Sequence, residues 1–285
     1  MGFSSIADIT TALDNGQFWS QHYIKPGVVG QSLGITSDLS GNTGTPVLSP
    51  YAATPLAFTP QSHDRNKFVF TGPTPPAGQS KYIMTWEMRH SSTQARVTYT
   101  LCDLLGFYAA IDSDSVDLQT MDNTLTLPRY TSGEGVQMVI QNSVATSASN
   151  IATIEYLNHL GQTKTITSTV LQRTATQVAS CASNAFSGNA TSLFLSLTSG
   201  DLGVRQVNSI QFDTAVGGLM NLLLVKPIAR TVSNENLVST EKNFITQQGI
   251  TMPKLEDGAA LIIYAHGALA SAIAPIHGYF NFVWG

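Results

Sequence analysis

The chain has 285 residues, with 14 lysines and arginines against 18 aspartates and glutamates, and charged side chains make up 11% of it, less than half of the ~25% usual in soluble domains. Hydrophobic residues make up 42%, which together with the low charge excludes an intrinsically disordered chain and a coiled coil. The net charge of −4 and the scattered cations exclude a nucleic-acid-binding protein, which presents a basic stripe. The composition therefore predicts a globular, Thr-rich protein whose surface is polar but sparsely charged.

Residues 5–15 carry the strongest helix signal in the chain. Ser5 is followed three positions later by Asp8, which fits a capping box, and Gly16 follows the last apolar position. A helix of this length is not stable alone in water, so its apolar stripe must pack on the body of the protein or on a neighbouring subunit. We take the apolar side chains of this region as candidate assembly contacts: Ile6, Ile9, Leu13, Phe18, Trp19 and Tyr23.

From residue 25 to about residue 64 the pattern changes to Gly, Pro, Ser and Thr without periodicity. A segment of ~40 such residues is too long for an ordinary loop and indicates an extended arm. Its prolines favour an extended backbone. We therefore expect residues 1–64 to form an N-terminal helix and arm, and residues 65–285 to form the body.

Beyond residue 65 the hydrophobic pattern has a period of two, which is typical of strands. Residues 151–158 and 163–170 are joined by a short Gly-containing connection and predict a β-hairpin. Thr163, Thr165, Thr167 and Thr169 fall on one face of its second arm, and β-branched residues favour strands. The segment 104–110 is open between a helical turn and a strand. Further strands are expected at residues 67–72, 82–90, 96–101, 136–140, 192–197, 204–212, 219–225, 259–265 and 277–284.

This spacing of short strands predicts an all-β fold, a β-sandwich or jelly roll with a short N-terminal helix. No alternation of strands and helices indicates a parallel sheet, and no fixed repeat indicates a propeller or solenoid. The stretch 258–285 carries no charged side chain, but its histidines, Pro275 and Asn281 are costly in a bilayer. We interpret it as two buried strands, and we expect no membrane partner.

Motifs that would carry catalysis or metal binding are few and do not support one another. Residues 30–34 match the GxSxG string around Ser32, which works only where a strand ends and a helix begins, and here it lies in the Gly/Pro-rich arm. Cys102 and Cys181 lack metal-ligand spacing, and we expect free, buried thiols. The six histidines show no close pairing of the metalloenzyme type.

The densest acidic stretch is Asp112–Asp117, and calcium prefers several hard oxygen ligands on a flexible loop. Counted from Asp112, Val116 stands at position 5 of the loop, where an EF-hand needs a ligand, and no glutamate ends the loop. We interpret the stretch as a solvated loop with Asp-capped turns, while a cation or a glycan at this loop stays open as an alternative.

Three segments between residues 154 and 228 resemble structural proteins of tailed-bacteriophage virions. IEYLNHLGQTKT, LTSGDLGVRQVNSIQF and GGLMNLLLVKPIA are similar to a "YTN-x-x-G" hairpin, a "GD-x-GV-x-x-V" turn and an "LVKPL"-like strand of that group. The likeness covers about a quarter of the chain and implies a virion protein of the head decoration or cement type. The matching positions are Tyr156, Asn158, Gly161, Gly200, Asp201, Gly203, Val204, Arg205, Val207, Leu224, Val225, Lys226 and Pro227.

Independently of the resemblance, residues 200–205 read as a tight polar turn between two strands. Gly200 and Gly203 supply positive φ, and we expect Arg205 to pair with Asp201 across the turn as a structural clasp. We therefore treat Gly200, Asp201, Gly203 and Arg205 as a structural turn.

Together these observations predict a non-enzymatic virion protein, assembled in the host cytoplasm, that decorates or cements the head shell and binds it through its N-terminal arm. We expect a homo-oligomer, with a trimer as the leading form, and the major capsid protein as partner. No cofactor is expected. The alternatives are a neck, collar or tail adaptor or a fibre-base protein, a glycan-binding jelly-roll module, and an esterase acting through Ser32.

Overall fold

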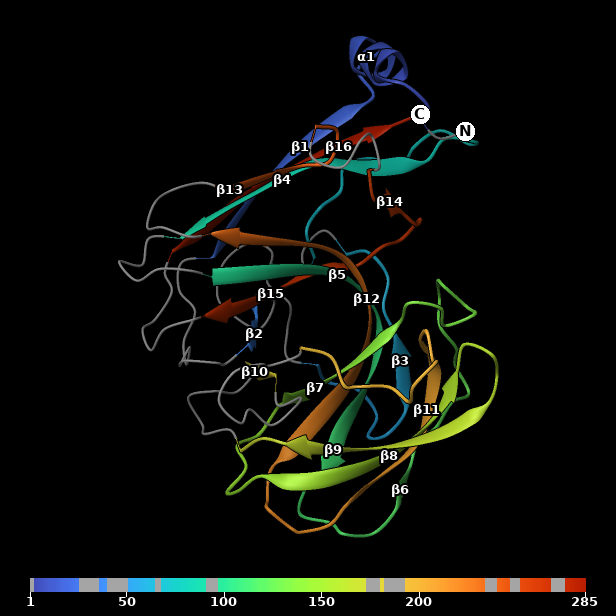
Figure 1. Cartoon of the computed structure of the whole chain (residues 1–285), viewed down its shortest axis with the longest axis vertical. Helices are drawn as coiled ribbons and strands as arrows, with labels where there is room; N and C mark the ends of the chain where they lie inside the picture. Colours follow the sequence, from blue (N-terminus) through green and yellow to red (C-terminus); the bar gives the residue numbers. More distant parts are fainter. Residues whose placement is uncertain are drawn as a thin grey trace.

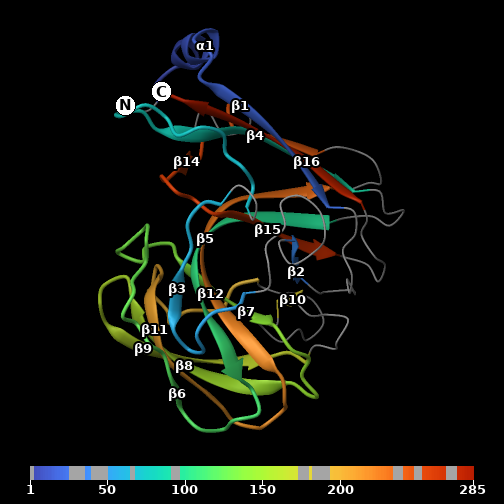
Figure 2. The ribbon, with the colours of Figure 1, turned by 180° about the vertical axis from the view of Figure 1, so that it is seen from behind.

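A computed structural model describes residues 3–25, 36–39, 51–64, 68–90, 97–172, 180–181, 193–233, 240–246, 252–267 and 275–285. Strands in several antiparallel sheets make up most of this part of the chain, with one short α-helix. The predicted all-β sandwich is therefore confirmed. Figures 1 and 2 show the sheets stacked along the long axis of the molecule.

The helix α1 spans Ile6–Asp14. The backbone amide of Ser5 donates to Asp8 Oδ2 (2.8 Å), and the amide of Asp8 donates to Ser5 Oγ (3.2 Å), so the predicted capping box is confirmed. Ile9 and Ala12 are buried in a cluster that also contains Val283, which places one face of α1 on strand β16 (Ile276–Trp284).

Three sheets build the body, and we name them from their positions in Figure 1. The upper sheet contains β1 (Phe18–Lys25), β16, β4 (Lys81–His90) and β13 (Thr240–Asn243) in that order, and β14 (Lys254–Leu255) also pairs with β4. The lower sheet contains β6 (Gln119–Thr120), β11 (Val204–Phe212), β8 (Asn150–Asn158) and β9 (Thr163–Val170) in that order. The central sheet contains β12 (Leu219–Ser233), β7 (Gln137–Asn142), β10 (Ser180–Cys181), β2 (Thr36–Asp38), β15 (Leu261–Gly267), β5 (Val97–Asp112) and β3 (Phe58–Pro60) in that order.

The central sheet closes on itself, because β12 at one end of its order also pairs with β5. The β5–β12 pairing runs from Val97 to Asp112 on one strand and from Leu219 to Ser233 on the other, so these two strands cross the whole central layer. Closure satisfies the backbone groups that an open sheet leaves unpaired at its edges.

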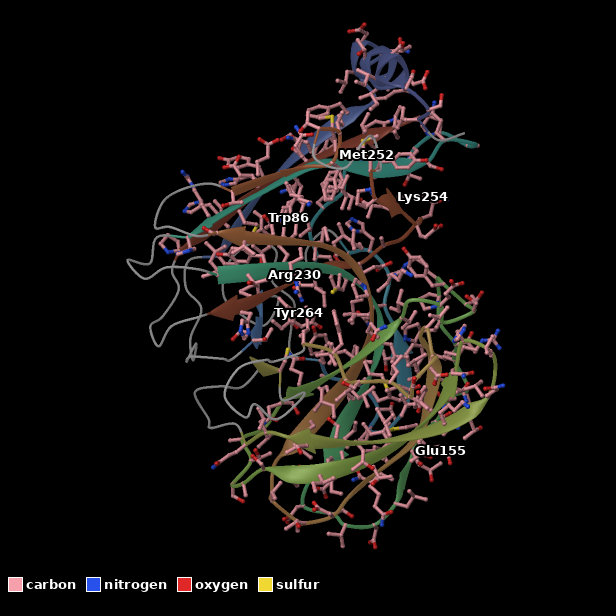
Figure 3. All side chains as sticks on the ribbon, in the orientation of Figure 1. Trp86, Glu155, Arg230, Met252, Lys254 and Tyr264 are labelled. Atoms are coloured by element: carbon pink, nitrogen blue, oxygen red, sulfur yellow. The ribbon has the colours of Figure 1, made fainter. Side chains whose placement is uncertain are left out.

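The two long strands contribute to three separate clusters of buried side chains. On β5, Tyr99 and Leu101 pack with the upper sheet, Cys102 and Leu104 pack inside the closed central sheet, and Tyr108 packs with the lower sheet. Three irregularities in the β5–β12 register change which face each residue presents. In Figure 3, Trp86 lies between the upper and central sheets, whereas Glu155 lies on the lower sheet.

A buried ion pair joins β5 to the segment that precedes β7. The guanidinium of Arg129 donates to both carboxylate oxygens of Asp103, at 2.9 and 2.7 Å, and to the carbonyl oxygens of Gln61 and Leu104. The amide of Ala260 donates to Asp103 Oδ1 at 2.8 Å. Burial raises the pKa of Asp103, while the hydrogen bonds and charge of Arg129 act in the opposite direction.

The strand predictions are confirmed for the hairpin β8–β9 and for the strands of most other predicted segments. The threonine row of β9 lies on the more exposed face, opposite the buried Ile166, Ser168 and Val170. The open segment 104–110 is a strand, part of β5. The expected strands at 67–72 and 192–197 are wrong, because residues 68–72 and 193–197 are not in a strand.

Parts of the predicted arm pair with the strands of the body. β1 pairs with β16, β2 pairs with β10 and β15, and β3 pairs with β5. Residues 26–35 and 40–50 of the arm, which include Ser32, lie outside the described residues. The division of the chain at residue 64 stays a prediction.

The buried ion pair gives a test of the fold. Replacing Arg129 by Met leaves the carboxylate of Asp103 buried without its partner, and we expect the free energy of unfolding to fall by about 3–5 kcal/mol. The double variant Asp103→Leu/Arg129→Met removes both charges and is expected to lose less than the single variant. Lys254→Met is the control, since it breaks the exposed 3.5 Å pair with Glu256 and should cost less than about 1 kcal/mol. Denaturant unfolding measures all three, and an equal loss in the single and double variants would contradict the account.

Candidate functional site

Three turns meet beside the lower sheet, and we call them the turn cluster: residues 130–136, 159–162 and 198–204. The amide of His159 donates to Gly203 O (3.0 Å), the amide of Gly135 to Leu202 O (2.8 Å), and the amide of Val204 to Val136 O (3.2 Å). Backbone hydrogen bonds therefore fix the three turns to one another, although they lie far apart in the sequence. Most of the polar and glycine positions that resemble phage virion proteins lie in this cluster or at its border.

The carboxylate of Asp201 is the central acceptor of the cluster. Tyr156 Oη donates to it at 2.5 Å and Asn158 Nδ2 at 2.7 Å, both from strand β8. The amide of Thr198 in turn donates to Tyr156 Oη at 3.0 Å, so the tyrosine hydroxyl both gives and receives a hydrogen bond. These bonds tie the turn before β11 to the strand beside it.

Asn158 also shapes the β8–β9 turn. It is fully buried, and its Oδ1 accepts the amides of Leu160 (3.0 Å) and Gln162 (2.8 Å). Gly161 adopts φ +75°, a conformation that glycine takes without strain. One asparagine thus uses both ends of its amide, one toward its own turn and the other toward Asp201.

The environment of Asp201 keeps its carboxylate ionised. Burial raises the pKa of this group, but the hydrogen bonds from Tyr156 and Asn158 and the nearby charge of Lys164 outweigh that effect, and the pKa is lowered. An ionised, doubly hydrogen-bonded carboxylate is a structural acceptor, and it is a poor proton acceptor for catalysis.

The two glycines of the predicted structural turn act differently. Gly200 adopts φ +91°, as expected. Gly203 does not adopt positive φ, and it is required for another reason: a Cβ at this position would collide with the carbonyl oxygen of Gly133. Gly133 in turn faces the backbone of Val204. The turns therefore touch backbone to backbone, which excludes any side chain at the contact.

The predicted clasp between Arg205 and Asp201 is wrong. Arg205 Nε donates instead to the carbonyl oxygen of Ser132 at 3.0 Å, and Asp201 is occupied by Tyr156 and Asn158. Arg205 therefore holds the 130–136 turn rather than its own turn. The physical reason is that Arg205 finds its partner on the 130–136 turn, whereas Asp201 finds its partners on strand β8.

A shallow pocket of about 410 Å³ opens at the border of the cluster. Lys226 Nζ lies 5.2 Å from the centroid of the Tyr130 ring and donates to the carbonyl oxygen of Glu134 at 2.9 Å. Exposed apolar side chains stand nearby: Leu160 is 66% exposed and Leu202 57% exposed. The cluster therefore presents two leucines beside the cations Arg205 and Lys226.

The six candidate assembly contacts of the N-terminal region divide into two groups. Ile6, Leu13 and Phe18 are exposed, at 60%, 39% and 37%. Ile9 and Tyr23 are buried in the upper core, and Trp19 packs edge-on against Phe70. Three of the six side chains thus remain accessible to a partner, while the others hold α1 and β1 on the protein's own upper sheet.

The other residues considered for chemistry take structural roles where they are described. Asp112 Oδ1 accepts the amide of Asp114, and Asp114 Oδ1 accepts the amide of Gly217, as expected for Asp-capped turns. Cys102 and Cys181 are buried thiols that form no disulfide, as predicted. In the described ranges, no group of three or more His, Cys, Asp and Glu side chains is arranged to hold a metal ion.

Sequence reasoning missed the 130–136 turn as a member of the cluster. Its glycines at positions 133 and 135 were a usable signal for close backbone approach, but nothing in the local pattern indicates which other turn they approach. Within the part of the chain that the structure covers, no helix is long and apolar enough to span a bilayer.

Comparisons with known proteins give limited information. No protein-family model matches this chain, and no curated protein matches it. Among solved structures, the chain is similar to the infectious bursal disease virus Gt strain structure at 9% identity, over 94% of this chain and 80% of that chain, with a TM-score of 0.19. It is likewise similar to the VP2 subviral particle of that virus, at 9% identity over 93% and 80% of the two chains, again with a TM-score of 0.19. These neighbours are viral capsid proteins, and at these values no feature of theirs is transferred to this chain.

The hydrogen bonds of Asp201 make a second prediction. Tyr156 and Asn158 donate to different oxygens of Asp201. Asp201→Asn replaces one of these acceptors by a donor, so one of the two hydrogen bonds is lost, and we expect the free energy of unfolding to fall by about 2 kcal/mol. Because the folded-state pKa of Asp201 is lowered, its contribution is present above about pH 4 and is lost as the pH falls through the lowered pKa. The variant should lose this part of the acid dependence.

Asp117→Asn is the matched control, because Asp117 is exposed and its side chain makes no hydrogen bond among the described residues. Urea unfolding at pH 7 and at pH 3 compares the two variants with the wild type. Equal stability of Asp201→Asn and the control at pH 7 would contradict the role assigned to the carboxylate.

Proposed function

We propose that this chain is a non-enzymatic structural protein of a tailed-phage virion, and specifically a decoration or cement subunit of the head shell. One observation carries the proposal. Most of the polar and glycine positions that resemble phage virion proteins lie in the hydrogen-bonded turn cluster around Asp201 or at its border, and the third segment reaches it through Lys226. The resemblance therefore corresponds to one three-dimensional unit, as expected if the three segments specify a shared local structure.

The chemistry of the described residues favours binding over catalysis. The polar groups of the turn cluster are occupied by one another, and the carboxylate of Asp201 is held ionised by Tyr156 and Asn158. The accessible groups that remain include the apolar Leu160 and Leu202, the partly buried cation of Lys226 and the carboxylate of Glu134. Such groups suit a protein contact.

The low charge of the chain supports an extensive contact surface. Burying an ion at an interface carries a desolvation cost, whereas hydroxyls, amides and apolar side chains are buried with less penalty. With 11% charged residues, most of this surface can be covered by neighbouring subunits without that cost. A protein that repeats over a symmetric shell forms such contacts many times.

In this proposal the N-terminal region, residues 1–64, binds the shell, and the major capsid protein is the partner. Three side chains of α1 and the start of β1 are accessible and serve as assembly contacts of this region: Ile6, Leu13 and Phe18. The subunit forms a symmetric homo-oligomer, with a trimer as the leading form, and acts in the virion after assembly in the host cytoplasm.

The exposed face of α1 gives the test. Ile6→Gln/Leu13→Gln keeps good helix formers on the helix and removes two apolar contacts, each worth about 1–2 kcal/mol when buried. We expect particles assembled with this variant to carry at least about tenfold fewer copies than wild-type particles, as measured by quantitative mass spectrometry. The matched control is Val116→Gln/Leu118→Gln, which changes two similarly exposed apolar side chains on a loop away from α1. Normal incorporation of the α1 variant would refute the assigned contact.

A further inference from the structure

The exposed face of α1 is both apolar and acidic. Ile6 and Leu13 lie on it, and the helix carries Asp8 and Asp14 with no basic residue. Asp8 is used by the capping box, whereas Asp14 is exposed and makes no ion pair within the described residues. A surface that fits this face needs apolar side chains flanked by cations.

The turn cluster offers such a surface. Leu160 and Leu202 project from two turns that are hydrogen-bonded to each other, and each is more than half exposed. Arg205 and Lys226 stand beside them. Lys226 Nζ uses one of its three donors, on Glu134 O, and in the described part of the chain the terminal nitrogens of Arg205 have no hydrogen-bond partner. These cations can therefore receive a carboxylate from outside.

The two surfaces cannot meet within one chain. Figures 1 and 2 show α1 at one end of the long axis and the lower sheet at the other, with the upper and central sheets between them. The helix is held in place because Ile9 and Ala12 are buried against the upper sheet. The partner for each surface is therefore on another molecule, and the complementary surface exists on a second copy of this chain.

We propose that α1 of one copy binds the turn cluster of a neighbouring copy, with Ile6 and Leu13 on Leu160 and Leu202, and Asp14 facing Arg205 and Lys226. The inference rests on the proposed function, because it assigns α1 to the neighbouring subunit and leaves the rest of residues 1–64 for the shell. Loss of α1 contacts then lowers incorporation into particles, since a monomer lacks the avidity of the oligomer.

A contact between two different surfaces is heterologous. Repeated by a rotation that closes, it forms a ring, and if the rotation does not close it forms a filament. Because α1 and the turn cluster lie far apart on a long molecule, each copy in such a ring contacts its two neighbours through separate surfaces. A closed trimer of this kind has no unused α1 and no unused turn cluster.

Complementation between two defective variants tests the proposal. Ile6→Gln/Leu13→Gln has a defective helix face and an intact turn cluster, whereas Leu160→Gln/Leu202→Gln has the reverse. We expect the wild type to form a closed oligomer, each variant alone to be monomeric with a contact on the order of 100-fold weaker, and an equal mixture to form a heterodimer. Sedimentation velocity measures all four samples. Val116→Gln/Leu118→Gln should behave as the wild type.

Any of three results would overturn the proposal: the wild type is monomeric, either variant alone forms the same oligomer as the wild type, or the mixture of the two variants stays monomeric. A second pair keeps the test independent of the glutamine variants: under oxidising conditions Leu13→Cys mixed with Leu160→Cys should give a disulfide-linked dimer, and Leu13→Cys mixed with Leu118→Cys should not. The native Cys102 and Cys181 are buried and do not compete. Incorporation into particles is measured separately. If the two variants form a heterodimer but the wild type is not incorporated, only the virion role is contradicted. If the wild type is incorporated but the two variants do not associate, only this contact is contradicted.

Discussion

The pairing of β5 with β12 is the interaction on which the rest of the structure depends. The two strands lie side by side over 16 and 15 residues, and they supply side chains to the upper core, the lower core and the interior of the closed central sheet. The register irregularities along this pairing turn successive segments toward different layers. Without these irregularities, the side chains of each strand would alternate between only two faces and could not reach three separate clusters.

The same strand positions the turn cluster through a short chain of contacts. Asp103 lies near the middle of β5 and holds Arg129 by a buried bidentate ion pair. Arg129 immediately precedes the 130–136 turn, whose glycines allow backbone contact with the turn at Gly203. Asp201 then fastens that turn to β8. The exposed leucines of the cluster are therefore placed by rigid elements, which is what a specific contact surface requires.

Local patterns predicted the elements, and long-range contacts limited the prediction of the site. The capping box of α1 and the hairpin β8–β9 could be predicted because their signals lie within a few residues. The strand expected at residues 82–90 is present as β4, but a period of two does not give its burial, because a register shift near Met84 leaves Ile83 and Trp86 both buried. β2 and β10 are too short for any periodic pattern. The partners of Arg205 and Asp201 lie 73 and 45 positions away, on a turn and on a strand whose proximity only the fold determines.

The surface is sparsely charged, with an apolar helix face at one end and, far from it, a turn cluster that carries two leucines and two cations. The central claim is that these features serve assembly in a virion. The most direct measurement is the copy number of this chain relative to the shell subunit in purified virions of its source. The account predicts a number comparable with that of the shell subunit. Few copies would place the protein at the neck or tail, and absence from the particles would contradict the account.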